Sequence, residues 1–412
     1  MNEHVLDNGL RLVHAYDAAT AMVAVDVLYN TGHRDERRGL TGIAHLFEHL
    51  MFGGSRNVSS FDGTLEAAGG KSNAWTSADF TNFYETLPAR NLDTALFLES
   101  DRMLAPDLSE HSLEVQKSVV VEEFKQQCLD RPYGDLMHHL RRLAYGASHP
   151  YSWPTIGLEP DHIVRVTQAD AREWFYSHYA PNNAVLAIVG HVDFDEACAA
   201  AERWFGDVPR RDIAPRVAVD PGFPASDIVE TVEGPVPYPL IMVAYPMDSY
   251  GTEAYYAADT ITDLLSAGRS ARFRTDLVER RACGLISEAD ASIVGSELPG
   301  LLLLTARVAD NDTAAIERAR KLLIEEARRL AAPGEVSAQE LERSFNNFEA
   351  NHRFSNIGYL PQALTLATAA MHGESPEAPV EAHRALTPSI ITSTAERIFG
   401  SPSVSVVYRP KL

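Results

Sequence analysis

The feature that most constrains the fold is one order of strands and helices that occurs twice along the chain. Strands at 22–30, 71–77 and 80–88 precede several helices and a closing strand at 183–190. The second half repeats this order up to a strand at 403–408. The stretch 209–226 between them is rich in proline and lacks helical periodicity, which is typical of a linker. Two runs of about 200 residues with one order of elements predict an internal duplication. We therefore expect similar domains at 1–208 and 227–412, joined by 209–226.

The residue pattern within each half predicts the α+β class. HVLDNGLRLVHAY (4–16) places Asn8-Gly9 between two alternating segments, which is the strongest short signal for a β-hairpin. Longer segments with helical periodicity follow the strands. We expect two similar domains, each a mostly antiparallel sheet packed with several helices. Helical periodicity predicts helices at 41–52, 90–104, 109–128, 134–145 and 357–372, and one continuous helix at 379–399.

Charge and cysteine content exclude several function classes. The formal net charge of −21 argues against binding to nucleic acid or to an anionic membrane surface. No apolar run is long enough to cross a bilayer. The three cysteines are scattered and indicate a reducing compartment, while the first residues lack the basic and apolar stretches of a signal peptide. We expect a cytoplasmic protein, unless a leader was removed before this sequence begins.

The stretch GIAHLFEHLMFGGS (42–55) contains a possible metal site. His45 and His49 are four residues apart, so on a helix their imidazoles lie on one face, a turn apart. Two such nitrogens suit adjacent corners of a zinc tetrahedron, and a carboxylate at Glu48 can accept a proton from water. H-x-x-E-H is the inverted form of a zinc-protease motif. Taken alone, the same residues also fit an ordinary surface helix.

A third ligand is available in the helix expected at 109–128. Glu122 and Glu123 follow an apolar, β-branched run, where one of two adjacent carboxylates is expected to be buried. A buried carboxylate needs a cation, and a metal ion would serve. Helical periodicity places Glu122 and Glu123 about 100° apart and does not decide between them.

Together these residues resemble the pitrilysin/insulysin family of zinc metallopeptidases, which includes the mitochondrial processing peptidases. The similarity rests on G-x-A-H-x-x-E-H-x-x-F-x-G-[ST] at 42–55, AAGGKSNAWTS at 67–77, VVVEEF at 119–124 and YAPNNAVLAIVGHVD at 179–193. The resemblance implies that His45, His49 and Glu123 bind Zn²⁺ and that Glu48 is the general base.

The resemblance also implies how substrate binds and where this chain departs from the family. Family members add the substrate backbone to an exposed strand, which here corresponds to Asn73, Ala74, Trp75 and Thr76. A plain core strand is the alternative for this segment. Family enzymes carry an Arg and a Tyr, seven residues apart, in the second domain to hold substrate and the developing oxyanion. Val278 and Leu285 occupy those positions here.

We therefore expect a zinc endopeptidase that hydrolyses peptides or unfolded segments in a chamber formed by two chains. The chain would form a homodimer using other groups, such as one of the arginines or Tyr359, or a heterodimer whose related subunit supplies the Arg/Tyr pair. The remaining alternative is a slow enzyme that lacks the pair. The competing prediction is a non-catalytic peptide-binding or assembly subunit of a processing peptidase-like complex, and a third is a zinc hydrolase acting on a smaller amide.

Overall fold

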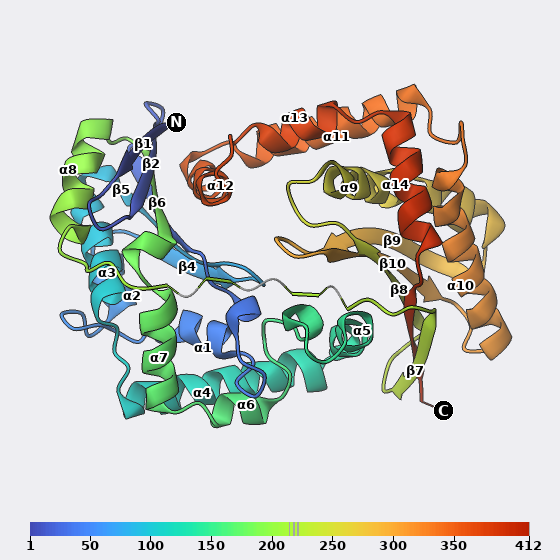
Figure 1. Cartoon of the computed structure of the whole chain (residues 1–412), viewed down its shortest axis with the longest axis horizontal. Coiled ribbons are helices and arrows are strands. Elements are labelled where there is room, and N and C mark those ends of the chain that lie inside the picture. Colours follow the sequence, from blue (N-terminus) through green and yellow to red (C-terminus); the bar gives the residue numbers. More distant parts are fainter. Residues whose placement is uncertain (214, 217–218, 221, 412) are drawn as a thin grey trace. The chain divides into compact units, whose positions relative to one another are not determined.

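The computed structural model describes residues 1–213, 215–216, 219–220 and 222–411, which form two compact units (Figure 1). Unit 1 comprises Met1–Phe124, Pro154–Val217 and Arg353–Pro376, and unit 2 comprises Lys125–Trp153, Ala218–His352 and Glu377–Leu412. Each unit has one sheet packed with helices, which confirms the α+β class. Positions 214, 217, 218 and 221 of the predicted linker lie outside the described residues. The predicted domain limits at 208 and 227 stay a prediction.

Unit 1 contains a six-stranded sheet with the order β1-β2-β6-β3-β5-β4. Its strands are β1 (Asn2–Val5), β2 (Arg11–Tyr16), β3 (Met22–Tyr29), β4 (Lys71–Thr76), β5 (Thr81–Pro88) and β6 (Ala184–Gly190). Its helices are α1 (Ile43–Leu50), α2 (Phe61–Ala67), α3 (Leu92–Leu104), α4 (Glu110–Phe124), α6 (Pro160–Val164), α7 (Gln168–His178), α8 (Phe194–Phe205) and α12 (Tyr359–His372). The Asn8-Gly9 hairpin is confirmed, with Gly9 at φ 91° and the Asn8 side chain accepting the Leu10 N–H.

Unit 2 contains a five-stranded sheet with the order β7-β11-β8-β10-β9. Its strands are β7 (Ile228–Gly234), β8 (Leu240–Met247), β9 (Ile286–Val294), β10 (Gly300–Val308) and β11 (Val404–Pro410). Its helices are α5 (Leu136–Tyr145), α9 (Glu253–Ser266), α10 (Thr313–Arg328), α11 (Ala338–Ser355, which passes into unit 1 at Arg353), α13 (Ala378–Arg384) and α14 (Pro388–Gly400).

The two sheets repeat one topology. Without β1, the first sheet reads β2-β6-β3-β5-β4, which matches β7-β11-β8-β10-β9 strand for strand. Each sheet has one parallel pair among antiparallel ones, β2 with β6 and β11 with β7. The predicted recurrence of one element order, with mostly antiparallel pairing, is confirmed.

The repeat includes an exchange of one helix that the sequence did not predict. Between β5 and β6 the third helix is α5, and between β10 and β11 the third helix is α12. Helix α12 packs on β3, β6 and β2 of unit 1, whereas α5 packs on β11 and β8 of unit 2. Each half of the sequence therefore covers one face of the other half's sheet with the equivalent helix.

The prediction of one continuous helix at 379–399 is wrong. The chain forms α13 and α14 instead, and the break lies at Thr387, whose backbone is extended (φ −122°, ψ 158°). Pro388 disfavours a helical conformation at the preceding residue, and its missing N–H suits the first position of a new helix. The Thr387 hydroxyl accepts the Ile390 N–H and caps α14.

The sheet of unit 1 is covered on both faces, and α1 lies on one of them. Val23, Val25 and Val27 of β3 share a core with apolar residues of α1, while alternate residues of β3 face α12. Helix α1 contacts β4 on one side and α4 on another (Figure 1). Among the described residues, no helix combines the length and apolar character needed to span a membrane.

Candidate metal centre

The candidate site is on the half-buried face of α1. Leu46, Phe47 and Leu50 are fully buried against the core and fix the rotation of the helix. The helical period then places His45 and His49 together on the other side, with ring centroids 4.8 Å apart. The side chains of His45 and His49 are 13% and 25% exposed, so the pair is sheltered but open to solvent.

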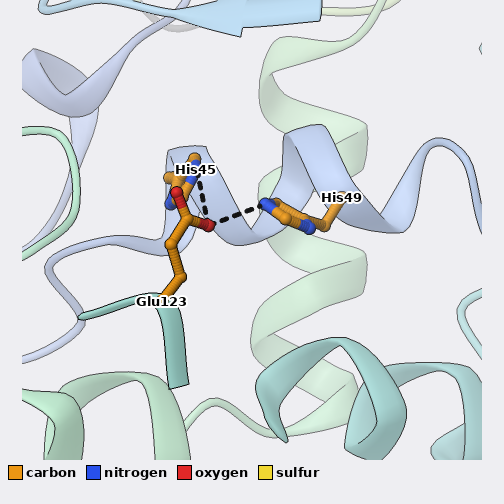
Figure 2. A group of neighbouring side chains, drawn as sticks. All are labelled: His45, His49 and Glu123. Atoms are coloured by element: carbon orange, nitrogen blue, oxygen red, sulfur yellow. Dashed lines mark ion pairs between the residues drawn. The ribbon is translucent and has the colours of Figure 1, made fainter. Parts of the chain in front are cut away.

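Glu123, in the last turn of α4, meets both histidines. One carboxylate oxygen, Oε2, lies 3.7 Å from His45 Nε2 and 3.4 Å from His49 Nε2, as the dashed lines of Figure 2 mark. Ligand atoms about 2.0–2.1 Å from a tetrahedral zinc ion lie about 3.3 Å from one another. The two distances from Glu123 are therefore close to the spacing that zinc requires, and the ligand atoms of all three residues lie within 4.8 Å of one another, so the group fits the ion. Glu122 is exposed and is not part of this group.

The electrostatics of His45 and Glu123 suit a cation. Burial lowers the pKa of His45 to about 4, against the opposing effect of Glu123 and with a further contribution from His49. A hydrogen bond with His49 holds the pKa of Glu123 below its usual value. Neutral imidazole and ionised carboxylate are the forms that bind a metal ion.

Glu48 lies beside this group and contacts the neighbouring strand. The Thr76 hydroxyl donates to Glu48 Oε2 at 2.5 Å. Burial raises the pKa of Glu48, while the hydrogen bond from Thr76 and the proximity of His49 oppose the rise. A carboxyl with a raised pKa is a better proton acceptor at neutral pH than an ordinary glutamate. The arrangement would allow proton transfer next to a cation held by His45, His49 and Glu123.

The segment predicted to bind substrate is the edge strand of the unit 1 sheet. Strand β4 pairs with β5 on one side and is last in the strand order. Ala74 and Thr76 lie on the sheet face shared with α1, and Trp75 packs on the face covered by α12. Asn73 is exposed, and its side-chain oxygen accepts the Ala74 N–H. A strand at an edge has backbone groups available for another chain.

The positions expected to carry an Arg and a Tyr have no polar role. Val278 and Leu285 are partly buried and pack against the core of unit 2. Tyr359, considered above as a substitute, begins α12 and packs on the sheet of unit 1.

The sequence did not predict two acidic residues, one that holds the start of α1 and one that binds the segment after this helix. Before the helix, Glu36 Oε1 accepts the N–H groups of Gly42 (2.9 Å) and Ala44 (3.0 Å). After it, Asp101 accepts hydrogen bonds from Ser55 and Asn57. Glu36 lies in a run of charged residues, and Asp101 lies in a helix far along the chain. No local capping pattern marks either residue.

Several known proteins with sequences similar to this chain are named zinc proteases. Family models described as "Insulinase (Peptidase family M16)" and "Peptidase M16 inactive domain" match residues 11–146 and 165–348. "Zinc protease PqqE" of Helicobacter pylori is 28% identical over 353 residues, which is 84% of this chain and 78% of that protein. The match to "Uncharacterized zinc protease YmxG" of Bacillus subtilis spans only 50% of each chain.

Solved structures extend the similarity to the whole chain. The crystal structure of a protease from Helicobacter pylori has a TM-score of 0.89 and 26% identity, with 99% of both chains covered. Pitrilysin, at 18% identity, shares the fold with a TM-score of 0.82, and all of this chain covers 45% of pitrilysin. From the two family models and these relatives, the chain belongs to the M16 (insulinase) family of peptidases.

Proposed function

We propose that this chain is a zinc-dependent endopeptidase that hydrolyses peptides or unfolded polypeptide segments. The observation that carries the proposal is the convergence of His45, His49 and Glu123, with Glu48 beside them. Bound there, Zn²⁺ would polarise the scissile carbonyl and make water a stronger nucleophile at neutral pH. The names of relatives, which include several zinc proteases, support the same reaction.

The residues of the chain divide the remaining work. Glu48 accepts a proton from the attacking water and delivers it to the departing amine. Thr76 orients the Glu48 carboxylate through its hydroxyl, which ties the general base to β4. Because Thr76 belongs to the edge strand, a peptide added along Asn73–Thr76 would lie next to the general base. Extended peptides suit such an edge better than folded proteins.

We further propose that two chains form the working enzyme. The support is that positions 278 and 285 lack Arg and Tyr, so another group must stabilise the oxyanion. Residues 165–348 also match a model described as an inactive domain, and residues 227–412 contain no H-x-x-E-H motif. A related subunit would supply the missing pair in a heterodimer, and other groups would serve in a homodimer. We also propose a cytoplasmic location, which the three free cysteines support.

The test replaces Glu48 with glutamine, which keeps size and hydrogen bonding but removes the base. Glu48→Gln is expected to bind one zinc ion as the wild type does and to lose about 10²–10⁴-fold in peptide hydrolysis. Glu122→Gln is the matched control and is expected to retain activity. Cleavage of fluorogenic peptides measures both, with zinc content from elemental analysis.

A second candidate function is a non-catalytic peptide-binding or assembly subunit. Val278 and Leu285 favour it, because a site without oxyanion stabilisation binds substrate without turning it over. If the zinc-loaded wild type cleaves no peptide, alone or with a related subunit, but retains extended peptides, the enzymatic proposal is wrong and this candidate replaces it.

A further inference from the structure

Helix α1 is too short to hold its own position. It has eight residues and begins after Gly42. Isolated helices shorter than about 12 residues are marginal in water, so α1 depends on its neighbours. Its orientation matters because His45 and His49 both project from it.

The residue before α1 has no side chain that could cap the helix. Gly42 has φ +90°, and a Cβ at this position would lie 2.6 Å from Ile163 Cδ1 and 2.9 Å from the Ile156 oxygen. Both the conformation and the close approach require glycine. The free N–H groups at the start of α1 must therefore be satisfied from elsewhere.

Glu36 satisfies them from six residues earlier in the chain. A single oxygen, Oε1, accepts hydrogen bonds from Gly42 and from Ala44, the residue directly before His45. Glu36 is only 7% exposed, so its carboxylate is held inside unit 1. The same side chain thus fixes the first turn of the helix that carries both histidines.

The charge of Glu36 has a second effect. A helix N-terminus carries about half a positive charge, which disfavours a cation bound within a turn of it. His45 lies in the first turn of α1, so a cation at its Nε2 would experience this field. A buried carboxylate at the helix end offsets the field where solvent screening is weak.

We propose that Glu36 is a positioning residue for the metal site, acting through the backbone of α1 and through its charge. It sets the first turn and lowers the electrostatic cost of a cation between His45, His49 and Glu123. The inference rests on the metal site proposed above. The hydrogen bonds described for Glu36 go to the backbone of α1 and not to the side chains of His45, His49 or Glu123.

The test compares Glu36→Gln with Glu36→Ala. Glutamine retains an oxygen acceptor and removes the charge, whereas alanine removes both. The dissociation constant for zinc is measured by competition with a chromophoric chelator. The unfolding temperature of the zinc-free protein measures how much the hydrogen bonds from Glu36 to the start of α1 contribute to stability. We expect Glu36→Gln to weaken zinc binding about fivefold with a near-normal unfolding temperature, and Glu36→Ala to weaken it about tenfold or more with a lower unfolding temperature.

Thr167→Ala is the matched control, because it removes the N-cap of α7 in the same unit. It is expected to lower the unfolding temperature and to leave zinc affinity unchanged. If the zinc affinity of Glu36→Gln is within twofold of the wild-type value, the proposed effect of the Glu36 charge is wrong. If Thr167→Ala loses as much zinc affinity as Glu36→Ala, the Glu36 effect reflects only the general stability of unit 1. If His45→Ala binds zinc as the wild type does, the metal site itself is wrong, an outcome separate from failure at Glu36. Should Glu36→Ala not fold, Glu36→Gln decides.

Discussion

Glu122 and Glu123 are neighbours on α4 with different surroundings. Glu123 points at His45 and His49, and Glu122 is exposed. Periodicity alone could not distinguish them, because the burial of a residue near a helix end depends on which element packs there. The packing of α1 on α4 makes the difference.

Replacing each of these glutamates separates their roles. Glu123→Ala is expected to lose zinc affinity by more than about 100-fold, because loss of residues that only support a ligand costs about 10–100-fold. Glu122→Ala is expected to bind zinc as the wild type does. Chelator competition measures both variants, and the ligand assignment is wrong if Glu122→Ala shows the larger loss.

Asp26 is a buried acid on the sheet face that α12 covers. It is fully buried on β3 among apolar residues, and burial raises its pKa to about 8 from an ordinary value of 3.8, with Asn82 opposing the shift. The folded protein then holds a proton that the unfolded chain releases above pH 4. Stability is therefore expected to fall as the pH rises from about 4 to about 8 and to level off above that.

Asp26→Asn removes this dependence. The variant is expected to be more stable than the wild type by about 2 kcal/mol or more at pH 8, and similar to it at pH 4, since each pKa unit corresponds to about 1.4 kcal/mol. Thermal unfolding of the zinc-free protein at both pH values measures the difference. The control is Asp161→Asn, whose carboxylate is 74% exposed. If the difference in stability between the wild type and Asp26→Asn is the same at pH 4 and pH 8, the argument that burial raises the pKa of Asp26 is wrong.

At the scale of elements, the sequence predicts type and approximate limits well. The alternation around Asn8-Gly9 predicted the first hairpin, and the helical period of GIAHLFEHL predicted α1. The continuous helix at 379–399 failed because apolar periodicity continues through Pro388, where the backbone breaks. Periodicity records which side of an element is apolar, and it does not record the partners at its ends.

The segment after α1 shows what such a partner does. Asp101 of α3 accepts hydrogen bonds from the Ser55 hydroxyl (2.5 Å), the Asn57 N–H (2.9 Å) and the Asn57 amide (2.7 Å). It is 5% exposed. These contacts tie the segment Ser55–Asn57, which follows the turn after α1, to α3.

Asp101→Asn is expected to destabilise unit 1 by about 1–3 kcal/mol, because one acceptor becomes a donor facing donors. Ser55→Ala removes one bond and is expected to cost less. Free energies of unfolding for the two single variants and the double variant complete a double-mutant cycle. Additive losses would show that Asp101 does not act through Ser55.

At the scale of the whole molecule, the exchange of α5 and α12 makes the halves interdependent. The apolar face of α12, with Ala363, Leu366, Ala367 and Ala370, predicts a buried helix. It does not identify the sheet that buries the helix, because any apolar sheet face fits such a surface. Because α12 lies between strands β10 and β11 in the sequence, sequence order alone would have placed it on the sheet of the second half.

Expression of the fragment 1–208 tests this interdependence. Without α12, the sheet face around Val13, Leu28 and Val185 is uncovered, so the fragment is expected to aggregate or to bind a hydrophobic dye. Co-expression with 209–412 is expected to give a soluble complex that co-purifies. A soluble fragment 1–208 that remains monomeric and binds no dye would contradict the role of α12.

The exchanged helix also affects folding during synthesis, because the sheet of unit 1 is synthesised well before α12, which covers one of its faces. The last strand of the unit 1 sheet ends at Gly190, but α12 is complete only at His372. At a synthesis rate of about 5–20 residues per second, the nascent chain waits on the order of ten to forty seconds between these points. During that interval one face of a finished sheet has no cover, so we expect the growing chain to bind ribosome-associated chaperones until α12 has been synthesised.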